Sequence, residues 1–457
     1  MERHLEAGSD GIAVRGWTQE MVAFQQHVLQ HPPAARKVVR PCVLEDGIHA
    51  LSAADVERWA ERWNSALDAR GPVLAFVPAS GAATRMFQDF VPPVRPEVAE
   101  RLSACWRDFP FADQSDWQQG LDALWKPGGW ASLPKGMVPF FRLADGSIQT
   151  ALDAHHMEWC WHSDGLIKHP LVFTVPPSFQ SELKARWSEA GDYVRFEIQH
   201  AETDTLAWDL EADDWFRDDS GSLVFRPGGH GALLQNLNAQ EAHWAFLRNV
   251  DNVVTPGSEV WKGRIQWRAA LGGLLAEWVE ERNALAEGLL AGDVGAERRI
   301  RDWLGQVWDP IAWPQDTGGW LRLLNRPMRV AAVVRNEGQP GGGPFWVADA
   351  EGIRPQVVES TELPSGWRGA GTHFNPVDMV CCLRGVGSER LDLPLFSDPE
   401  AFFTAEKVVQ GRRVRILERP GLWNGGMAGW LTRFVEVPSW TFSPVKTAWD
   451  LLRFKSE

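Results

Sequence analysis

Short apolar runs alternate with amphipathic segments through the middle of the chain. A short apolar run bounded by Gly or Pro is typical of a buried parallel strand, and the segments between these runs have helical spacing. The predicted order is strand 73–77, a helix from about 84, strand 137–141, helix 147–161, strand 171–175, helix 178–190 and strand 193–199. This order predicts an α/β fold with a mixed, mostly parallel sheet flanked by helices.

The pattern changes on both sides of this core. Residues 1–70 are predicted to be an N-terminal helical extension, with amphipathic segments at Thr18–His31 and, after a Ser52 cap, up to Arg70. Residues 71–325 contain the α/β core. Residues 326–457 are richer in short β runs, at 329–334, 345–347 and 356–358, and are predicted to complete the site.

Two long helical segments belong to the core region. Residues 90–134 are too many for a plain loop and carry helical signals at 96–108 and 115–125, so we expect an inserted helical lid or flap. Residues 259–307 form a second helical block.

Composition narrows the class of protein. The chain has 457 residues, 44% of them hydrophobic, and a net charge of −14, which argues against nucleic acid or an anionic membrane as a partner. Its five cysteines show no C-x-x-C spacing, so a disulfide framework or zinc site is not expected. The start, Met1-Glu-Arg-His-Leu-Glu, lacks an apolar region, and no run is long enough for a membrane span. We expect a reduced, cytoplasmic protein.

The clearest candidate for chemistry is the stretch from Val73 to Arg85. An apolar run ends at Pro78 and is followed by the small residues Ala79-Ser-Gly-Ala-Ala83, which let backbone N–H groups approach a ligand closely. A small-residue loop between a strand and a helix N-terminus favours anion binding, and the Arg85 guanidinium would face phosphate groups. The alternative is an ordinary turn with a surface arginine.

Three further stretches carry candidate side chains. Lys135 lies just before a predicted strand, His230 lies among three glycines, and Asp251 lies between two asparagines after an apolar run. An oxygen-rich end of this kind suits Mg²⁺, which takes one or two carboxylates and completes its shell with water and phosphate. The alternatives are a solvated loop lysine, a loop histidine without a role and an aspartate that caps a turn.

These stretches also resemble, in order, the motifs of the UDP-sugar pyrophosphorylases of the UDP-N-acetylglucosamine pyrophosphorylase type. The matching segments are Ala79-Ser-Gly-Ala-Ala-Thr-Arg-Met86 (A-G-G-x-G-T-R-L), Pro134-Lys-Gly-Met137 (P-K-G-M), Phe196-Glu-Ile-Gln199 (F-E-Q), Pro227-Gly-Gly-His-Gly231 (P-P-G-H-G), Val250-Asp-Asn252 (V-D-N), Pro355-Gln-Val-Val-Glu-Ser-Thr-Glu362 (P-Q-V-V-E-Y-S-E), Gly369-Ala-Gly-Thr-His-Phe-Asn375 (N-A-G-N-x-x-N) and Phe442-Ser-Pro-Val-Lys446 (F-S-P-L-K). Eight matches in the right order are far more specific than any one of them. The whole chain also resembles a bacterial family of unknown function, through R-P-G-G-H-G-A, N-E-G-x-P-G-G-G-P-F-W and E-R-P-G-L-W-N-G.

The first resemblance implies a glycosyltransferase-A-like (nucleotide-diphospho-sugar transferase) fold and assigns roles. It implies nucleotide binding by Ser80, Gly81, Thr84, Gln199, Gly229 and His230, charge neutralisation by Arg85, Lys135 and Lys446, sugar binding by Glu359, Thr372 and Asn375, and Mg²⁺ binding by Asp251. The family's reaction is the transfer of a nucleotidyl group, here expected to be uridylyl from UTP, to a sugar 1-phosphate with release of pyrophosphate.

Several departures from the family pattern bear on this expectation. Ser80 and Ala83 replace two signature glycines, Thr372 replaces an Asn, and the 90–134 segment is much longer than the family's connection. Two alternatives therefore stay open: a glycosyltransferase that uses a nucleotide-sugar donor, although the chain lacks a D-x-D at the end of the nucleotide-binding half, and a nucleotide- or sugar-phosphate-binding protein without turnover.

Overall fold

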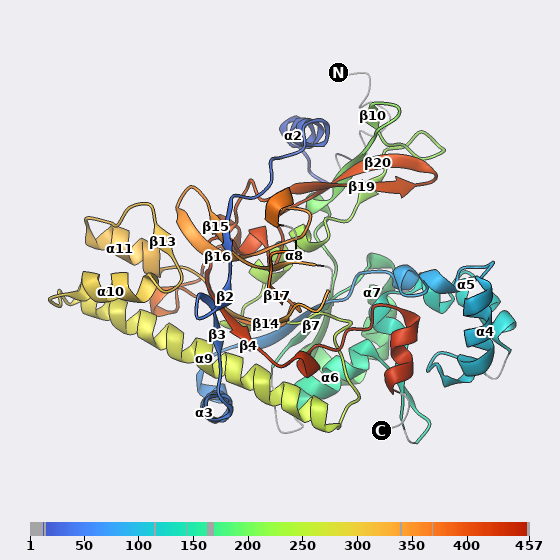
Figure 1. Cartoon of the computed structure of the whole chain (residues 1–457), viewed down its shortest axis with the longest axis horizontal. Coiled ribbons are helices and arrows are strands. Elements are labelled where there is room, and N and C mark those ends of the chain that lie inside the picture. The colour runs from blue at the N-terminus through green and yellow to red at the C-terminus, as the bar shows by residue number, and fades with distance from the viewer. Residues whose placement is uncertain are drawn as a thin grey trace.

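The computed structural model describes residue 12 and residues 15–113, 116–143, 145–161, 169–338, 341–367 and 369–454. Its centre is a mixed sheet crossed by helices on both faces (Figure 1). The strand order is β2 (Val43–Leu44), β3 (Gly47–Ala50), β21 (Leu431–Glu436), β14 (Met328–Arg335), β18 (Met379–Cys382), β12 (Trp244–Leu247), β4 (Val73–Pro78), β7 (Leu171–Thr174) and β8 (Val194–Glu197), with β17 (His373–Phe374) paired to β14.

Strand direction decides where the loops of this sheet meet. The strands from β12 to β8 pair in parallel, and so do the strands from β14 to β2. Strand β18 lies between the two groups and runs antiparallel to both β12 and β14. The two groups therefore point the same way, so the carboxyl ends of β4, β8 and β12 and the start of β18 lie at one edge of the sheet.

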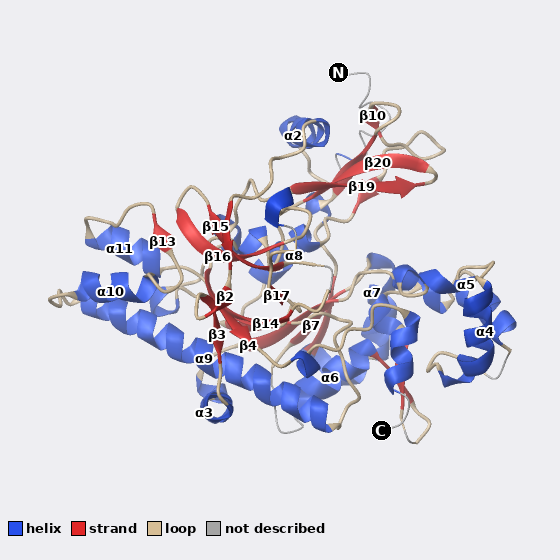
Figure 2. Cartoon of the chain, in the orientation of Figure 1, coloured by secondary structure: helices blue, strands red, loops and turns tan. Residues whose placement is uncertain are grey.

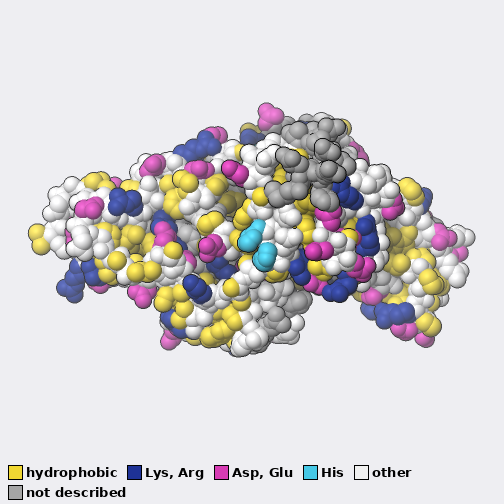
Figure 3. All heavy atoms as spheres, turned by 90° about the horizontal axis from the view of Figure 1, so that it is seen from above, with side chains coloured by type: hydrophobic (Ala, Val, Ile, Leu, Met, Phe, Trp, Pro, Cys, Tyr) yellow, Lys and Arg dark blue, Asp and Glu magenta, His cyan; other side chains and the backbone are white. Residues whose placement is uncertain are grey.

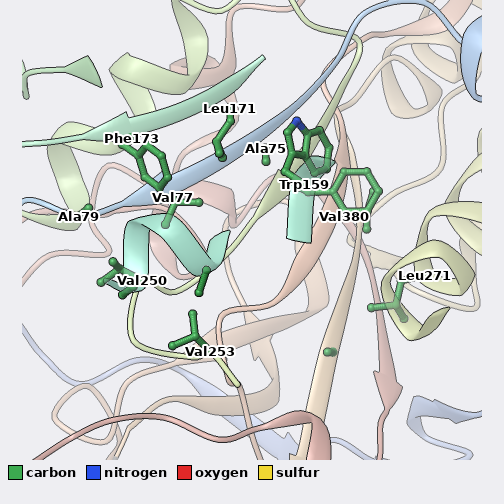
Figure 4. Packing of buried hydrophobic residues seen from close by; sticks show 14 of the residues in the cluster. Ala75, Val77, Ala79, Trp159, Leu171, Phe173, Val250, Val253, Leu271 and Val380 are labelled. Carbon is green, nitrogen blue, oxygen red and sulfur yellow. The ribbon is translucent and has the colours of Figure 1, made fainter. Parts of the chain in front are cut away.

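Two hydrophobic clusters cover the faces of the sheet. On one face α9 (Glu259–Leu290) packs against α3 (Ala53–Ser65), α6 (Ala151–Trp161) and the side chains of the strands. Figure 4 shows part of this cluster, in which Val77, Leu171, Phe173 and Trp159 lie close together. On the other face, α8 (His230–Asn238) and residues 422–430 contribute Leu233, Leu237, Trp423 and Trp430.

Smaller elements surround the central sheet (Figure 2). One outer sheet contains β1 (Val38–Pro41), β15 (Gly343–Ala348), β16 (Gly352–Val358) and β13 (Asp309–Pro310), and another contains β10 (Asp214–Trp215), β9 (Thr205–Asp209), β20 (Arg412–Glu418), β19 (Phe403–Val409) and β11 (Phe225–Arg226). Helix α2 (Gln19–Gln30) packs on β9 and β20. Further helices are α7 (Pro177–Arg186), α10 (Ala296–Leu304) and α11 (Thr317–Leu324).

The inserted segment forms a helical group at one end of the molecule. It contains α4 (Pro96–Cys105) and α5 (Trp117–Trp125), as the helical signals predicted, while residues 114 and 115 lie outside the described residues. Phe87, which precedes it, contacts Phe111 within it, and Phe90, its first residue, contacts Phe109. The segment is thus packed on the core through an aromatic cluster.

The helix predicted from about residue 84 is wrong. A single 3-10 turn covers Ala83–Arg85, and a second follows at Gln88–Phe90. The turn is of the 3-10 type because the Met86 N–H donates to the Ala83 carbonyl, three residues back, at 2.8 Å. Tertiary contacts hold it, since the Ala83 N–H donates to the Leu133 carbonyl at 2.9 Å and the Thr84 hydroxyl donates to the Ala131 carbonyl at 3.3 Å. The loop is therefore tied to the chain before Lys135 rather than extended into a helix.

Two other expectations need correction. The strand predicted at 137–141 is β5 (Pro139–Arg142), which pairs with β6 (Ile148–Thr150) in a separate two-stranded sheet. Residues 1–70 were expected to be helical throughout, but β1, β2 and β3 lie among them. Both helical segments there are present in α2 and α3, and residues 1–11, 13 and 14 lie outside the described residues.

Within the described ranges, no helix combines the length and the apolar character that a membrane span requires. On the face shown in Figure 3, acidic and basic side chains are interspersed.

The contact between α3 and α9 gives a stability prediction. A Cβ added at Gly273 would lie 2.0 Å from the Trp59 carbonyl oxygen. Gly to Ala in a helix is favourable by about 1 kcal/mol in itself, but overpacking costs about 1–3 kcal/mol. We expect Gly273→Ala to lower the melting temperature. Gly366→Ala is the control, because a Cβ at Gly366 meets no atom within 4 Å; equal melting temperatures for both variants would contradict this packing.

Candidate active site

A cavity of about 600 Å³ lies at the edge where the carboxyl ends of the parallel strands meet. Its walls come from the loops after β4, β8 and β12, the start of α8, the end of β16 and the turn before β18. The lining residues are Pro78, Ser80, Gly81, Arg85, Gln199, Gly229, His230, Leu233, Arg248, Asn249, Val250, Asp251, Gly341, Gly342, Val357, Glu359, Phe374, Asn375, Val377, Trp423 and Lys446. Segments far apart in the sequence thus share one cavity.

The small-residue loop after β4 forms one wall. Its Gly81 carbonyl accepts from the Lys135 N–H at 2.9 Å, so the two loops support each other. Gln199 Nε2 donates to the Ser80 hydroxyl at 2.9 Å. A Cβ added at Gly81 would meet nothing within 4 Å, so the backbone there is open to a ligand. Arg85 is exposed, and no ion pair of Arg85 occurs within the described ranges.

Asp251 is the centre of charge in the cavity. Its Oδ2 lies 2.7 Å from Lys135 Nζ and 3.2 Å from Lys446 Nζ. Its Oδ1 is buried and has no hydrogen-bond partner in the part of the chain that is described. Burial lowers the pKa of the Lys135 ammonium group, and the Asp251 carboxylate opposes this effect. The result is a pair of cations around one carboxylate that keeps a free oxygen for a metal ion or a ligand.

Buried groups fix the loop that carries Asp251. The His155 imidazole lies with Nε2 3.2 Å from the Val250 carbonyl, and Arg264 Nη2 donates to the Asn252 carbonyl at 2.6 Å. From the other side, the Ser443 N–H donates to the Asn252 side chain and the Val445 N–H donates to the Asp251 carbonyl, both at 2.9 Å. These bonds also fix the segment that carries Lys446 relative to Asp251.

The opposite wall presents hydrogen-bonding groups of another kind. Asn375 is 3% exposed; its Oδ1 accepts from the Val377 N–H at 2.6 Å, and its Nδ2 has no partner among the residues described. Burial raises the pKa of Glu359, and the nearby Glu418 carboxylate adds to this. This wall therefore offers an unsatisfied donor and a carboxyl group, which suit a hydroxylated ligand.

Two residues of the cavity have strained backbones. Val377 has a φ of 56° and Trp423 a φ of 64°. A β-branched or bulky residue in the left-handed region is uncommon and costs on the order of 1–3 kcal/mol. Strain of this kind concentrates at functional sites.

The candidate residues from the sequence do not all reach the cavity. Ten of them line it: Ser80, Gly81, Arg85, Gln199, Gly229, His230, Asp251, Glu359, Asn375 and Lys446. Lys135 lies behind the wall and reaches the site through Asp251. Two others point elsewhere, because the Thr84 hydroxyl bonds to Ala131 and the Thr372 hydroxyl lies 2.8 Å from His373 Nδ1.

Other lining residues were not singled out from the sequence. Gly341 and Gly342 come from the glycine-rich block 336–346, of which residues 339 and 340 lie outside the described residues, and Trp423 comes from the E-R-P-G-L-W-N-G block. Both blocks were visible as motifs. Their place in the cavity depends on sheet pairing that joins distant segments, which no local pattern reports.

Comparison with known proteins gives the family. The family model described as "Domain of unknown function (DUF4301)" matches residues 6–101 and 124–457. The chain belongs to the DUF4301 family. The residues outside the match are 1–5 and 102–123, and the second range lies in the helical insertion, from the end of α4 to most of α5. All segments that line the cavity of this DUF4301 protein lie within the match.

None of the curated proteins compared with the chain matches it. Among solved structures, the chain is similar to a UDP-glucose phosphorylase from Trypanosoma brucei, with 13% identity, a TM-score of 0.48, and coverage of 99% of this chain and 79% of the other. It is also similar to a mutant of UDP-glucose pyrophosphorylase from Leishmania major, with 14% identity and the same TM-score and coverage.

The buried His155 gives a pH prediction. Burial lowers its pKa well below the ordinary value of 6.5, so it folds as the neutral form, whereas the unfolded chain takes up a proton below about pH 6.5. We expect its contribution to stability to be fully present above that pH and to fall by up to about 1.4 kcal/mol per pH unit below it. Urea unfolding from pH 7 to pH 5 measures this fall. His155→Gln retains a donor for the Val250 carbonyl and should reduce the slope of the unfolding free energy against pH. An unchanged slope would contradict a neutral, buried His155 as its source.

Proposed function

We propose that the protein is a nucleotidyltransferase that transfers a nucleotidyl group, uridylyl from UTP, to a sugar 1-phosphate and releases pyrophosphate. The observation that carries the proposal is the arrangement around Asp251, where two lysine ammonium groups meet one carboxylate beside a loop whose backbone is open. Such a site suits a triphosphate, because it concentrates cations where the phosphates would lie. These cations are local, since the chain as a whole is acidic.

A glycosyltransferase-A-like fold is part of this proposal. It is supported by the ordered motif resemblance and by the position of the cavity, since ligands of open α/β sheets bind beyond the carboxyl ends of the strands. The wall with Asn375 and Glu359 favours a hydroxylated acceptor on that side of the cavity. The small-residue loop with Gln199 favours the nucleotide at the other wall.

The reaction needs little from the protein beyond positioning and charge. An oxygen of the sugar 1-phosphate attacks the α-phosphorus, the bond from that phosphorus to the bridging oxygen breaks, and pyrophosphate leaves with the electron pair. The attacking phosphate is already ionised, so no general base is required. Arg85, Lys135 and Lys446 would neutralise the negative charge of the phosphates in the transition state.

Mg²⁺ is the proposed cofactor, held by Asp251 Oδ1, which is buried and has no other partner within the described residues. No group of three or more acidic, His or Cys side chains that could bind a metal occurs in those residues. One carboxylate fits Mg²⁺ when phosphate oxygens and water supply the other ligands, and the ion would neutralise phosphate charge.

Pyrophosphate release tests the proposal directly. Purified protein with Mg²⁺ is screened with the four nucleoside triphosphates against hexose and N-acetylhexosamine 1-phosphates, and we expect release with UTP and one acceptor. Consumption of a nucleotide-sugar without pyrophosphate would support a glycosyltransferase instead. A nucleotide that raises the melting temperature without any turnover would support a binding protein.

Lys135→Ala tests the charge arrangement. Removing an electrostatic group of this kind costs on the order of a hundredfold to a thousandfold in kcat, and we expect a loss of that size while circular dichroism shows a folded protein. Lys262→Ala is the matched control, because Lys262 is half exposed and pairs only with Glu259 on α9 in the described structure. Full activity of the Lys135 variant would reject the assignment.

A further inference from the structure

Lys446 depends on its backbone for its position in the cavity. Its ammonium group lies 3.2 Å from Asp251 Oδ2, but its side chain is 56% exposed, so little packing restrains the flexible stem. Lys135, the other lysine on Asp251, is 15% exposed and is held by its surroundings. Where the Lys446 ammonium group lies therefore follows from how the chain is held at residue 446.

Hydrogen bonds fix the backbone on both sides of Lys446. Before it, the Val445 N–H donates to the Asp251 carbonyl at 2.9 Å. After it, the Ala448 N–H donates to the Met86 carbonyl at 2.8 Å, which ties the segment to the loop after β4. Val445 and Ala448 are both fully buried. The exposed lysine thus lies between two buried anchors.

A short C-terminal helix holds the backbone of Lys446 itself. The 3-10 helix Ala448–Phe454 begins directly after Thr447. Its Asp450 Oδ2 accepts from the Lys446 N–H at 2.8 Å and from the Thr447 N–H at 2.7 Å, and the Thr447 hydroxyl donates to the same oxygen at 3.2 Å. Because Asp450 belongs to the helix and binds the backbone of Lys446, a shift of the helix would move Lys446 with it.

Trp449, on the same helix, packs against the helical insertion. The Arg101 guanidinium of α4 lies over its ring, with Cζ 3.9 Å from the centroid, and the ring contacts Phe90 and Phe109 at centroid distances of 4.8 and 5.7 Å. Its Nε1–H donates to Asp89 Oδ2 at 3.2 Å. Cation–π and aromatic contacts of this kind add specific attraction to burial. The C-terminal helix, red in Figure 1, is thus attached to the insertion through this tryptophan.

We infer that Trp449 is a positioning residue, through which the helical insertion holds Lys446 at the phosphate-binding side of the cavity. The contacts run from α4 to Trp449, through its helix and Asp450 to the Lys446 N–H, and from Lys446 to Asp251. The inference rests on the proposed function, in which Lys446 neutralises phosphate charge. It gives a role to the insertion, part of which lies outside the family match.

Pyrophosphate binding measures this role without turnover, by calorimetric titration of the purified protein in the presence of Mg²⁺. Trp449→Leu removes the ring contacts and the bond to Asp89, so Lys446 loses its support. We expect the dissociation constant for pyrophosphate to rise on the order of tenfold, because a misplaced charge binds less well. Trp125→Leu is the matched control, since Trp125 Nε1 donates to the neighbouring Phe90 carbonyl at 2.9 Å and does not line the cavity. It should lower the melting temperature and leave the dissociation constant unchanged, and an equal rise in both variants would overturn the inference.

A double-mutant cycle separates positioning from general structural damage. Lys446→Met retains most of the stem and removes the ammonium group. If Trp449 acts through that ammonium group, Trp449→Leu has no further effect on pyrophosphate affinity once Lys446 is Met, so the two effects are not additive. Additive effects would show that Trp449 acts through the fold as a whole or through another group, and would overturn the inference.

A crystal structure distinguishes failure of this inference from failure of the proposed function. If wild-type protein neither releases nor binds pyrophosphate, the proposed function fails, and the positions of the two lysines then test the inference by themselves. In Trp449→Leu we expect Lys446 Nζ to lose its contact with Asp251 Oδ2, while Lys135 Nζ, on a different segment, keeps its own. A Lys446 Nζ that stays at the wild-type distance from Asp251 would overturn the inference.

Discussion

The ion pair of Asp251 with Lys135 and Lys446 is the interaction on which the candidate site depends. The three residues come from the loop after β12, the segment after the helical insertion and the C-terminal segment, and only the folded sheet brings them together. A carboxylate this deeply buried is costly unless it is paired. The pairing here leaves one carboxylate oxygen and one largely exposed ammonium group, that of Lys446, available to a ligand.

The rest of the architecture keeps that group of charges in place. The reversed strand β18 brings the Asn375–Val377 turn to the same edge as the ends of β4 and β12. Beneath the loop, His155 and Arg264 bind its carbonyl groups, and the C-terminal segment binds it from above. Local cations in an acidic chain then create a site whose charge is opposite to that of the molecule as a whole.

The two walls of the cavity differ in chemistry. One carries cations and an open backbone, and the other carries a buried amide donor and a carboxyl group with a raised pKa. This difference fits the two unlike substrates of the proposed reaction, a polyphosphate at one wall and a hydroxylated ring at the other. Val377 and Trp423, which have left-handed backbones, also line this cavity.

Local sequence determined much of the fold. Apolar runs bounded by Gly and Pro predicted β4 and β7, and the Ser52 cap predicted the start of α3, where the Ser52 side chain and Asp55 form a capping box. Only the tertiary structure decided the rest. The segment after Thr84 forms short 3-10 turns in place of the predicted helix, and the small-residue loop before it is tied to Leu133, fifty residues further along the chain. Strand β1 pairs with β15, and the buried Arg329 holds the turn that carries Trp423. Spacing along the chain encodes helices, caps and buried strands, whereas pairing between distant segments is settled by the competition among all available partners for hydrogen bonds and burial.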